Sequence, residues 1–142
     1  MSDARKQLLL PPPSAAGPGT LYQQIVDGLK REVSEGRLHA GTPLPSFRQL
    51  AEDLLVSVIT VKRAYEELER EGIIYRRQGL GTFVSKGGAD RSRESKAERA
   101  QALLRDGIRE ATEAGISAGD QRKLFEFILH DERERKHVRK RG

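Results

Sequence analysis

The chain has 142 residues, no cysteine and a formal net charge of +5. This length predicts one domain, or one small domain with an appendage, and the positive charge favours an anionic partner. Without cysteine, disulfide bonds and thiol chemistry are excluded. No apolar run approaches the roughly 20 residues of a membrane span, and Leu8–Leu10 is too short for a signal-peptide core. The sequence therefore predicts a cytoplasmic protein with no membrane partner.

Residues 1–19 are predicted to form a flexible N-terminal arm, because four prolines interrupt any helix there. Two roles stay open: an arm that contacts DNA or a partner subunit, and a disordered terminus. Thr20 can cap a helix that runs to about Glu35, and Gly36 ends it. The helix has an apolar stripe of Tyr22, Ile25, Val26, Leu29 and Val33.

Two short helices are predicted next. Ser46 caps the first, with Gln49 completing a capping box, and the helix runs out near Leu54. Ser57 caps the second, which Gly72 ends. The buried stripe of this second helix is predicted to contain Val58, Val61, Ala64, Tyr65 and Leu68. Two helices joined by a tight turn form a helix-turn-helix, whose second helix enters the DNA major groove.

A β-hairpin is predicted after Gly72. Residues 73–77 and 82–85 have strand character, and the glycine-containing turn 78–81 joins them. A hairpin that follows a helix-turn-helix is a wing. The fold class is therefore mainly α with a small β-hairpin: a winged helix-turn-helix over residues 20–86.

Three linked motifs in this region carry a family resemblance: PSxRxLA from Pro45, VSxxTVKRAYxELExEG from Val56, and GxGTFV from Gly79. At this spacing they resemble the GntR family of bacterial winged-helix transcription regulators. The KRAY core and the short length of chain that follows the wing resemble its YtrA-type branch. One departure is Leu55, which stands at a turn position where the family usually has glycine. A left-handed conformation at that position would strain leucine.

The resemblance implies a set of DNA-contact positions. Arg48 and Ser46 would anchor phosphate or an outer base, and Gln78 and Gly79 would enter the minor groove. Val58 and Ile59 lie where some members have polar residues that read bases. The predicted DNA-binding residues are Ser46, Arg48, Ser57, Thr60, Lys62, Arg63, Gln78 and Gly79.

Several of these residues could instead have a purely structural role. Arg48 could form a surface salt bridge with Glu52, and the Thr60 hydroxyl could bond the backbone of its own helix. Lys62 and Arg63 could pair with the glutamates four residues on, for a few tenths of a kcal/mol each. The acidic residues gather at the far end of the second helix, where they oppose its dipole. An arrangement that keeps negative charge away from DNA accounts for them.

The remaining chain is predicted to be a linker at 87–94, a two-helix dimerisation or effector segment at 95–137, and a basic tail at 138–142. Ser95 and Glu98 form a capping-box pattern for the first helix, and residues 133–141 are expected to fray. Two amphipathic helices are too few to bury their own stripes. A homodimer through Leu104, Ile108, Leu124 and Ile128 is therefore predicted, and the alternative is an intramolecular helical cap.

The sequence contains no residue pattern that indicates an enzyme active site or a metal site. The three histidines have no metal-ligand spacing, and Gly79–Gly81 lacks the frame of a phosphate loop. No cofactor, metal or catalytic residue is predicted. We predict a dimeric regulator, most simply a repressor, that binds a pseudo-palindromic operator in double-stranded DNA. The alternatives are a winged helix for protein contact and a non-specific nucleic-acid-binding structural protein. Whether a small-molecule effector binds is left open.

Overall fold

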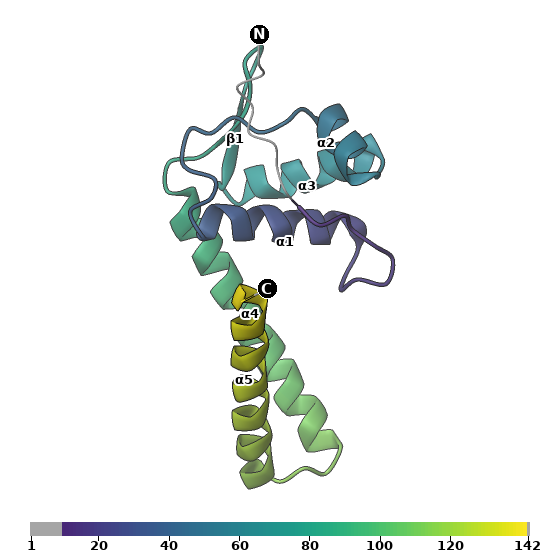
Figure 1. Cartoon of the computed structure of the whole chain (residues 1–142), viewed down its shortest axis with the longest axis vertical. Coiled ribbons are helices and arrows are strands. Elements are labelled where there is room, and N and C mark those ends of the chain that lie inside the picture. The colour runs from purple at the N-terminus through teal and green to yellow at the C-terminus, as the bar shows by residue number, and fades with distance from the viewer. Residues whose placement is uncertain (1–9, 142) are drawn as a thin grey trace. The chain divides into compact units, whose positions relative to one another are not determined.

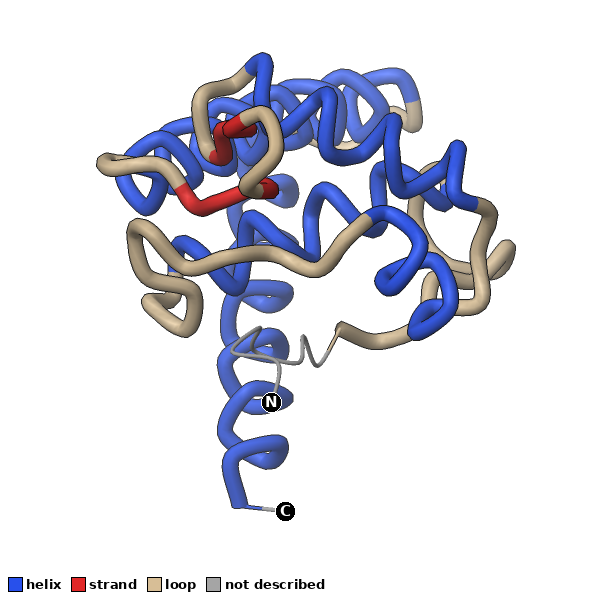
Figure 2. The backbone as a smooth tube through the Cα atoms, turned by 90° about the horizontal axis from the view of Figure 1, so that it is seen from above, coloured by secondary structure: helices blue, strands red, loops and turns tan. Residues whose placement is uncertain are grey.

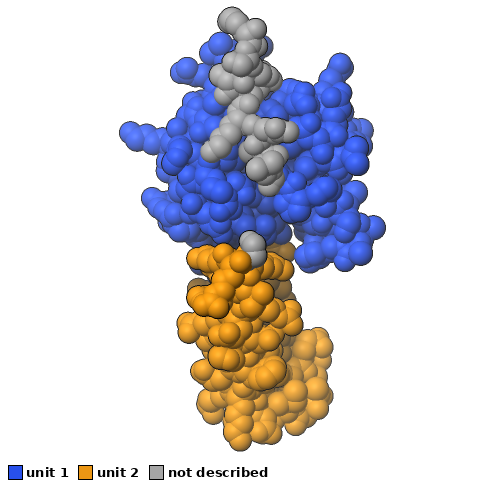
Figure 3. All heavy atoms as spheres, in the orientation of Figure 1, with its two compact units in different colours: residues 1–97 blue, residues 98–142 orange. Residues whose placement is uncertain are grey.

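A computed structural model describes residues 10–141 of the chain. The helices and strands follow in the order α1 (Leu21–Ser34), α2 (Phe47–Leu54), α3 (Val58–Arg70), β1 (Ile74–Arg77), β2 (Gly81–Val84), α4 (Gly88–Glu113) and α5 (Ala118–Arg141), as Figure 1 shows. The chain divides into two compact units, Met1–Ala97 and Glu98–Gly142, which Figure 3 colours separately. The mainly helical fold with one hairpin confirms the predicted fold class.

The first unit has a hydrophobic core that is closed by α1, α2, α3 and the hairpin. The stripe predicted for α1 is buried except for Tyr22, which is half-buried at the edge of the core. α3 packs against both α1 and α2 and buries Val61, Ala64, Tyr65 and Leu68. The Tyr65 hydroxyl donates to the Pro45 carbonyl over 2.8 Å, so the start of α2 is tied to the middle of α3.

Serine and threonine caps begin the first three helices as predicted. Thr20 forms a complete capping box with Gln23. At α2 only half of the predicted box forms: the Ser46 hydroxyl accepts from the Gln49 backbone, but the Gln49 side chain donates to Asp53. The box would need the Gln49 side-chain oxygen to accept from the Ser46 backbone N–H. The Gln49 amide nitrogen instead donates over 2.9 Å to the Asp53 carboxylate one turn further along the helix, a charge-assisted hydrogen bond.

The turn between α2 and α3 passes through Leu55 in the left-handed conformation, at φ 57° and ψ 44°. The sequence named this conformation as a source of strain without predicting the geometry of the turn, and the structure shows that Leu55 adopts it. The Leu55 side chain is 87% exposed, so no burial compensates for the strain.

The hairpin, whose strands are red in Figure 2, is antiparallel, with Ile74 opposite Val84 and Arg77 opposite Gly81. Ile74 and Val84 are buried at its base, and Tyr75 stacks on Phe83 with ring centroids 5.6 Å apart. Leu44 and Thr82 add a backbone hydrogen bond of 2.8 Å beside the sheet. These contacts hold the base of the wing, which we define as residues 74–84, to the core.

The helix predicted to begin at Ser95 begins at Gly88 instead, so the predicted linker is helical from that residue on. Tertiary contacts override the flexible composition: Arg91 donates to the Gly72 carbonyl at 3.0 Å and Arg93 to the Ser34 carbonyl at 2.9 Å. Gly88 is buried, and a Cβ there would lie 2.8 Å from the Ile73 carbonyl oxygen. The predicted division into domains stays a prediction.

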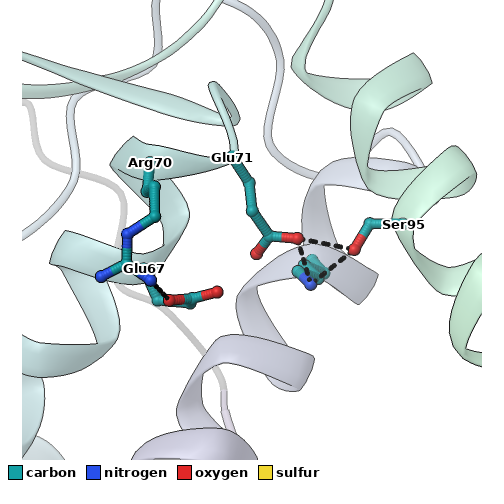
Figure 4. Close-up of polar contacts among 5 residues, drawn as sticks. Glu67, Arg70, Glu71 and Ser95 are labelled. Carbon is teal, nitrogen blue, oxygen red and sulfur yellow. Dashed lines mark hydrogen bonds and ion pairs between the residues drawn. The ribbon is translucent and has the colours of Figure 1, made fainter.

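A polar cluster joins three segments of the first unit. Lys30 of α1 donates to Glu71 over 3.0 Å and to Ser95 over 2.7 Å, and the Ser95 hydroxyl donates to the same Glu71 oxygen over 2.7 Å (Figure 4). Lys30 and Glu71 are largely buried, so each needs these partners. The cluster therefore couples the end of α3 to α1 and to the first turns of α4.

The second unit contains the rest of α4 and α5. In the described part of this unit, residues 98–141, no residue is buried. α5 continues as helix to Arg141, so the predicted fraying from residue 133 was wrong. Lysine and arginine in the last turn interact favourably with the helix dipole, which is a local reason for the helix to persist.

Candidate nucleic-acid interface

The first turn of α3 is exposed and carries several of the predicted contact residues. Ser57 caps the helix, and its hydroxyl accepts from the Thr60 backbone over 3.2 Å. The two hydroxyls, of Ser57 and Thr60, also lie 2.7 Å apart in a hydrogen bond. The Thr60 hydroxyl thus bonds the capping side chain rather than the helix backbone. Lys62 is exposed on the same helix.

Val58 was predicted to belong to the buried stripe of α3, and this was wrong. Val58 is 42% exposed and Ile59 is 79% exposed. Because Ser57 is the cap, Val58 is the first residue of α3 and lies at the end of the helix beyond the reach of the core. The buried stripe begins at Val61.

Arg63 has a partner that the sequence did not indicate. Its guanidinium carbon lies 3.9 Å from the centre of the Tyr22 ring, in the geometry of a cation–π contact. The pairings that we considered for Lys62 with Glu66 and for Arg63 with Glu67 do not form among the described residues. Glu67 pairs instead with Arg70 (Figure 4). Arg63 is therefore positioned by α1 at the side of the recognition helix.

Arg48 lies in the first turn of α2 and is exposed. Within residues 10–141 it forms no hydrogen bond or ion pair, so the alternative salt bridge with Glu52 is not present. A cation without a protein partner keeps all five N–H donors available for an anion.

A groove of about 360 Å³ runs between the start of α2 and the wing. Ser46 lines one side, and Gln78 and Gly79 line the other, so the fold brings together three of the predicted contact residues. Gly79 has a φ of 76°, and nothing lies within 4 Å of where its Cβ would be. The glycine is thus required by the turn, and it leaves open space on its outer side.

Two arginines that were not among the predicted contacts also line this groove. Arg76 lies with its guanidinium carbon 4.8 Å from the centre of the Phe47 ring, and Arg77 follows it on β1. Phe47 in turn packs edge-on against Tyr65, with centroids 5.2 Å apart. The basic run before the glycine turn was the available signal in the sequence, but the aromatic support under Arg76 depends on tertiary contacts.

The cations and hydroxyls of α2, α3 and the wing thus belong to one compact unit. Within residues 10–141, no group of three or more metal-binding side chains gathers anywhere, and no helix is long and apolar enough to span a bilayer. Exposed arginine, lysine and hydroxyl groups around the first turn of a helix suit phosphate and base edges. The arrangement matches a winged helix-turn-helix that docks on duplex DNA.

Comparison with known proteins decides the family. The model of the family described as "Bacterial regulatory proteins, gntR family" matches residues 21–84. The HTH-type transcriptional repressor YtrA of Bacillus subtilis is 36% identical over 108 residues, which cover 76% of this chain and 81% of YtrA. The chain belongs to the GntR family. It is a DNA-binding transcription regulator with a winged helix-turn-helix, and its family is one of regulators rather than enzymes.

Two further relatives define the extent of the likeness. The HTH-type transcriptional repressor NagR of Bacillus subtilis is 35% identical over 117 residues, and the match spans 82% of this GntR-family chain but only 44% of NagR. A solved GntR family transcriptional regulator from Listeria monocytogenes has a TM-score of 0.64 and 31% identity, covering 82% of this chain and 97% of that one. The likeness to the Listeria protein covers more of the chain than the winged helix alone.

Proposed function

We propose that this GntR-family protein is a repressor that acts as a homodimer and occupies a pseudo-palindromic operator. Each copy would place α3 in a major groove and its wing in the neighbouring minor groove. Two of the relatives, YtrA and NagR, are named repressors, which supports the sign of regulation. The single observation that carries the DNA-contact proposal is Arg48, which is exposed in the first turn of α2 and has no hydrogen-bond or ion-pair partner within residues 10–141.

The proposed contact residues differ in how they are held. Ser46 and Ser57 each accept one backbone hydrogen bond as helix caps, and a serine hydroxyl can also donate to phosphate. For Ser57 this requires Thr60 to be the donor in the hydrogen bond between their two hydroxyls. Lys62 and Arg48 would supply charge. Gln78 would extend from the wing tip, while Gly79 lets backbone approach the DNA.

Charge is separated along α3 in a way that supports this orientation. Lys62 and Arg63 lie in its first half, whereas its second half is acidic. Glu71 follows as the C-cap of the helix, and its carboxylate is paired with Lys30 in the polar cluster. An anionic duplex would therefore be attracted to the first half of α3 and repelled by the second.

The dimer proposal rests on the apolar side chains of the second unit. The large hydrophobic residues left exposed there are Leu103, Leu104, Ile108, Leu124, Phe125, Phe127, Ile128, Leu129 and Val138. A hollow of about 180 Å³ lies among Leu104, Ile108, Leu124 and Ile128. These are the four residues that the sequence assigned to dimerisation. A second copy of the same surface would cover them, since a two-fold interface is self-complementary.

The DNA contact is tested with Arg48→Ala in the full chain. A duplex is first selected from a random pool by the wild-type protein, and affinity is then measured by gel shift at fixed salt. We expect Arg48→Ala to weaken binding by about 1–3 kcal/mol, the cost of losing one charged contact. Arg105→Ala removes another exposed arginine, from α4, and should bind as wild type. Equal affinity of all three proteins would remove Arg48 from the interface.

The dimer is tested with Ile108→Glu, which places a charge in the apolar hollow. Light scattering should give a dimer for the wild type and a monomer for this variant, with much weaker binding to a two-site duplex. Ala102→Glu introduces the same side chain at another exposed position of α4 and should stay dimeric. A monomeric wild-type chain at tens of micromolar would refute the dimer.

A further inference from the structure

Two branched apolar side chains are left exposed at the start of α3. Ile59 is 79% exposed and Val58 is 42% exposed, and neither belongs to the hydrophobic core or to the residues packed against it. Both are β-branched, so they lower helix propensity slightly and gain no burial in return. Neither local folding nor core packing accounts for them.

The surroundings of this apolar pair are polar and cationic. Ser57 immediately precedes it, and Lys62 follows on the next helical turn, three residues after Ile59 and four after Val58. Residues at these spacings share a face of a helix. The apolar pair therefore lies between Ser57 and Lys62, two groups that suit phosphate. Ile59 is on the face of α3 turned away from the buried stripe, and Val58 lies beyond the end of that stripe.

The size of this patch argues against a protein partner. A stable protein interface covers about 800 Å² on each partner and needs a contiguous apolar centre. Two side chains beside a lysine do not provide one. A partner that presents a single apolar group among anionic groups fits this patch better than a protein surface does. The major groove of DNA offers one such group, the C5 methyl of thymine.

We propose that Ile59, with Val58 beside it, is a specificity residue that packs on thymine methyl groups in the major groove. This inference rests on the proposed DNA contact of α3 and adds the chemistry that is read. Lys62 and the hydroxyls of Ser57 and Thr60 hold the helix in register, and the two apolar side chains select A·T pairs opposite its first turn. Each operator half-site then has thymine at one or two of these positions.

Deoxyuridine tests this directly, because it pairs as thymine does and lacks only the methyl group. A duplex selected from a random pool by the full-length protein is remade with single thymine-to-deoxyuridine replacements. We expect the wild type to lose about fourfold in affinity at one or two positions in each half-site, the factor for one methyl-sized apolar group removed from contact. Replacements elsewhere in the duplex should have no effect.

Substitution of the protein then assigns the contact. At the DNA position that Ile59 contacts, Ile59→Ala should bind the thymine duplex and the deoxyuridine duplex with equal affinity. Val58→Ala should still bind the thymine duplex more tightly at that position. Because Ile59 is exposed, Ile59→Ala should melt at the wild-type temperature. Leu21→Ala is the matched control: it truncates an exposed leucine at the start of α1, outside the proposed DNA contacts, and should leave the pattern of deoxyuridine sensitivity unchanged.

The outcomes separate this inference from the proposed function. If the wild type selects and binds a duplex but is indifferent to every deoxyuridine, methyl readout is overturned and DNA binding stands. If Ile59→Ala and Val58→Ala both keep the full wild-type discrimination, the assignment to these residues is overturned. A chain that retains no duplex from the pool overturns both proposals.

Discussion

The two units of this protein differ in what they bury. Residues 25–84 enclose a core in which Leu50, Val61, Ala64 and Leu68 have no exposed surface, whereas residues 98–141 bury no side chain. The two helices that form the second unit are nevertheless longer than α1, α2 and α3, at 26 residues for α4, which begins in the first unit, and 24 for α5. Helix length thus follows local sequence, while burial requires a second surface. The first unit provides that surface from its own chain, and we propose that the second obtains it from another copy.

Truncation of one leucine in each unit should give the largest contrast. Leu68→Ala removes a fully buried side chain and should lower the free energy of unfolding by about 2–5 kcal/mol at any protein concentration. Leu124→Ala, at an exposed position, should cost less than about 1 kcal/mol in dilute solution, and more as rising concentration drives association. Urea denaturation at several concentrations measures both. A Leu124 effect that does not depend on concentration would argue against burial by a second copy.

The polar cluster of the first unit offers a smaller effect. Lys30→Ala leaves Glu71 largely buried with its charge unpaired, and we expect a loss of about 1–3 kcal/mol in the free energy of unfolding. Arg70→Ala is the control, because it breaks the exposed pair with Glu67 in the same part of α3 and should cost under about 0.5 kcal/mol. Thermal melts of the two variants compare them. Equal effects would mean that the Lys30 cluster contributes no more than a surface pair.

The smallest expected effect is a gain. Leu55 is the one residue other than glycine with a positive φ in the described part of the chain, and its side chain is exposed. Leu55→Gly should relieve the left-handed strain and raise the free energy of unfolding by about 1 kcal/mol, or a few degrees in Tm. Leu80→Gly removes another exposed leucine without this conformation and should give no gain. An unchanged or lower Tm for Leu55→Gly would show that the turn is not strained.

Much of the first unit could be predicted because its signals are local. Thr20, Ser46 and Ser57 are caps in the structure as in the sequence, and the spacing of apolar residues in α1 and α3 identifies most of the buried side chains. Leu55 was singled out because the resembled family usually has glycine there, but only the structure showed its left-handed conformation. The DNA-contact residues stay a prediction, and the structure places three of them, Ser46, Gln78 and Gly79, around one groove.

The errors arose where a distant segment decides the outcome. Gly88 begins a helix although its neighbours are typical of a linker, because Arg91 and Arg93 bond carbonyls at the ends of α3 and α1. Arg76 and Arg63 were not expected on aromatic rings, because Phe47 and Tyr22 are far from them in the sequence. Periodicity also placed Val58 in the core, which the end of a short helix does not reach.

By itself the sequence determined α1, α2 and α3, their caps and the hairpin, because each depends on the order of residues over a turn or two, and its three linked motifs identified the family. Only the tertiary structure decided which side chains of those elements are left without a partner. The exposure of Arg48, Val58 and Ile59 is of this kind. A side chain is available to a ligand only when none of the residues that the fold places around it buries it or bonds to it. That depends on packing in three dimensions, which segments distant in the sequence determine.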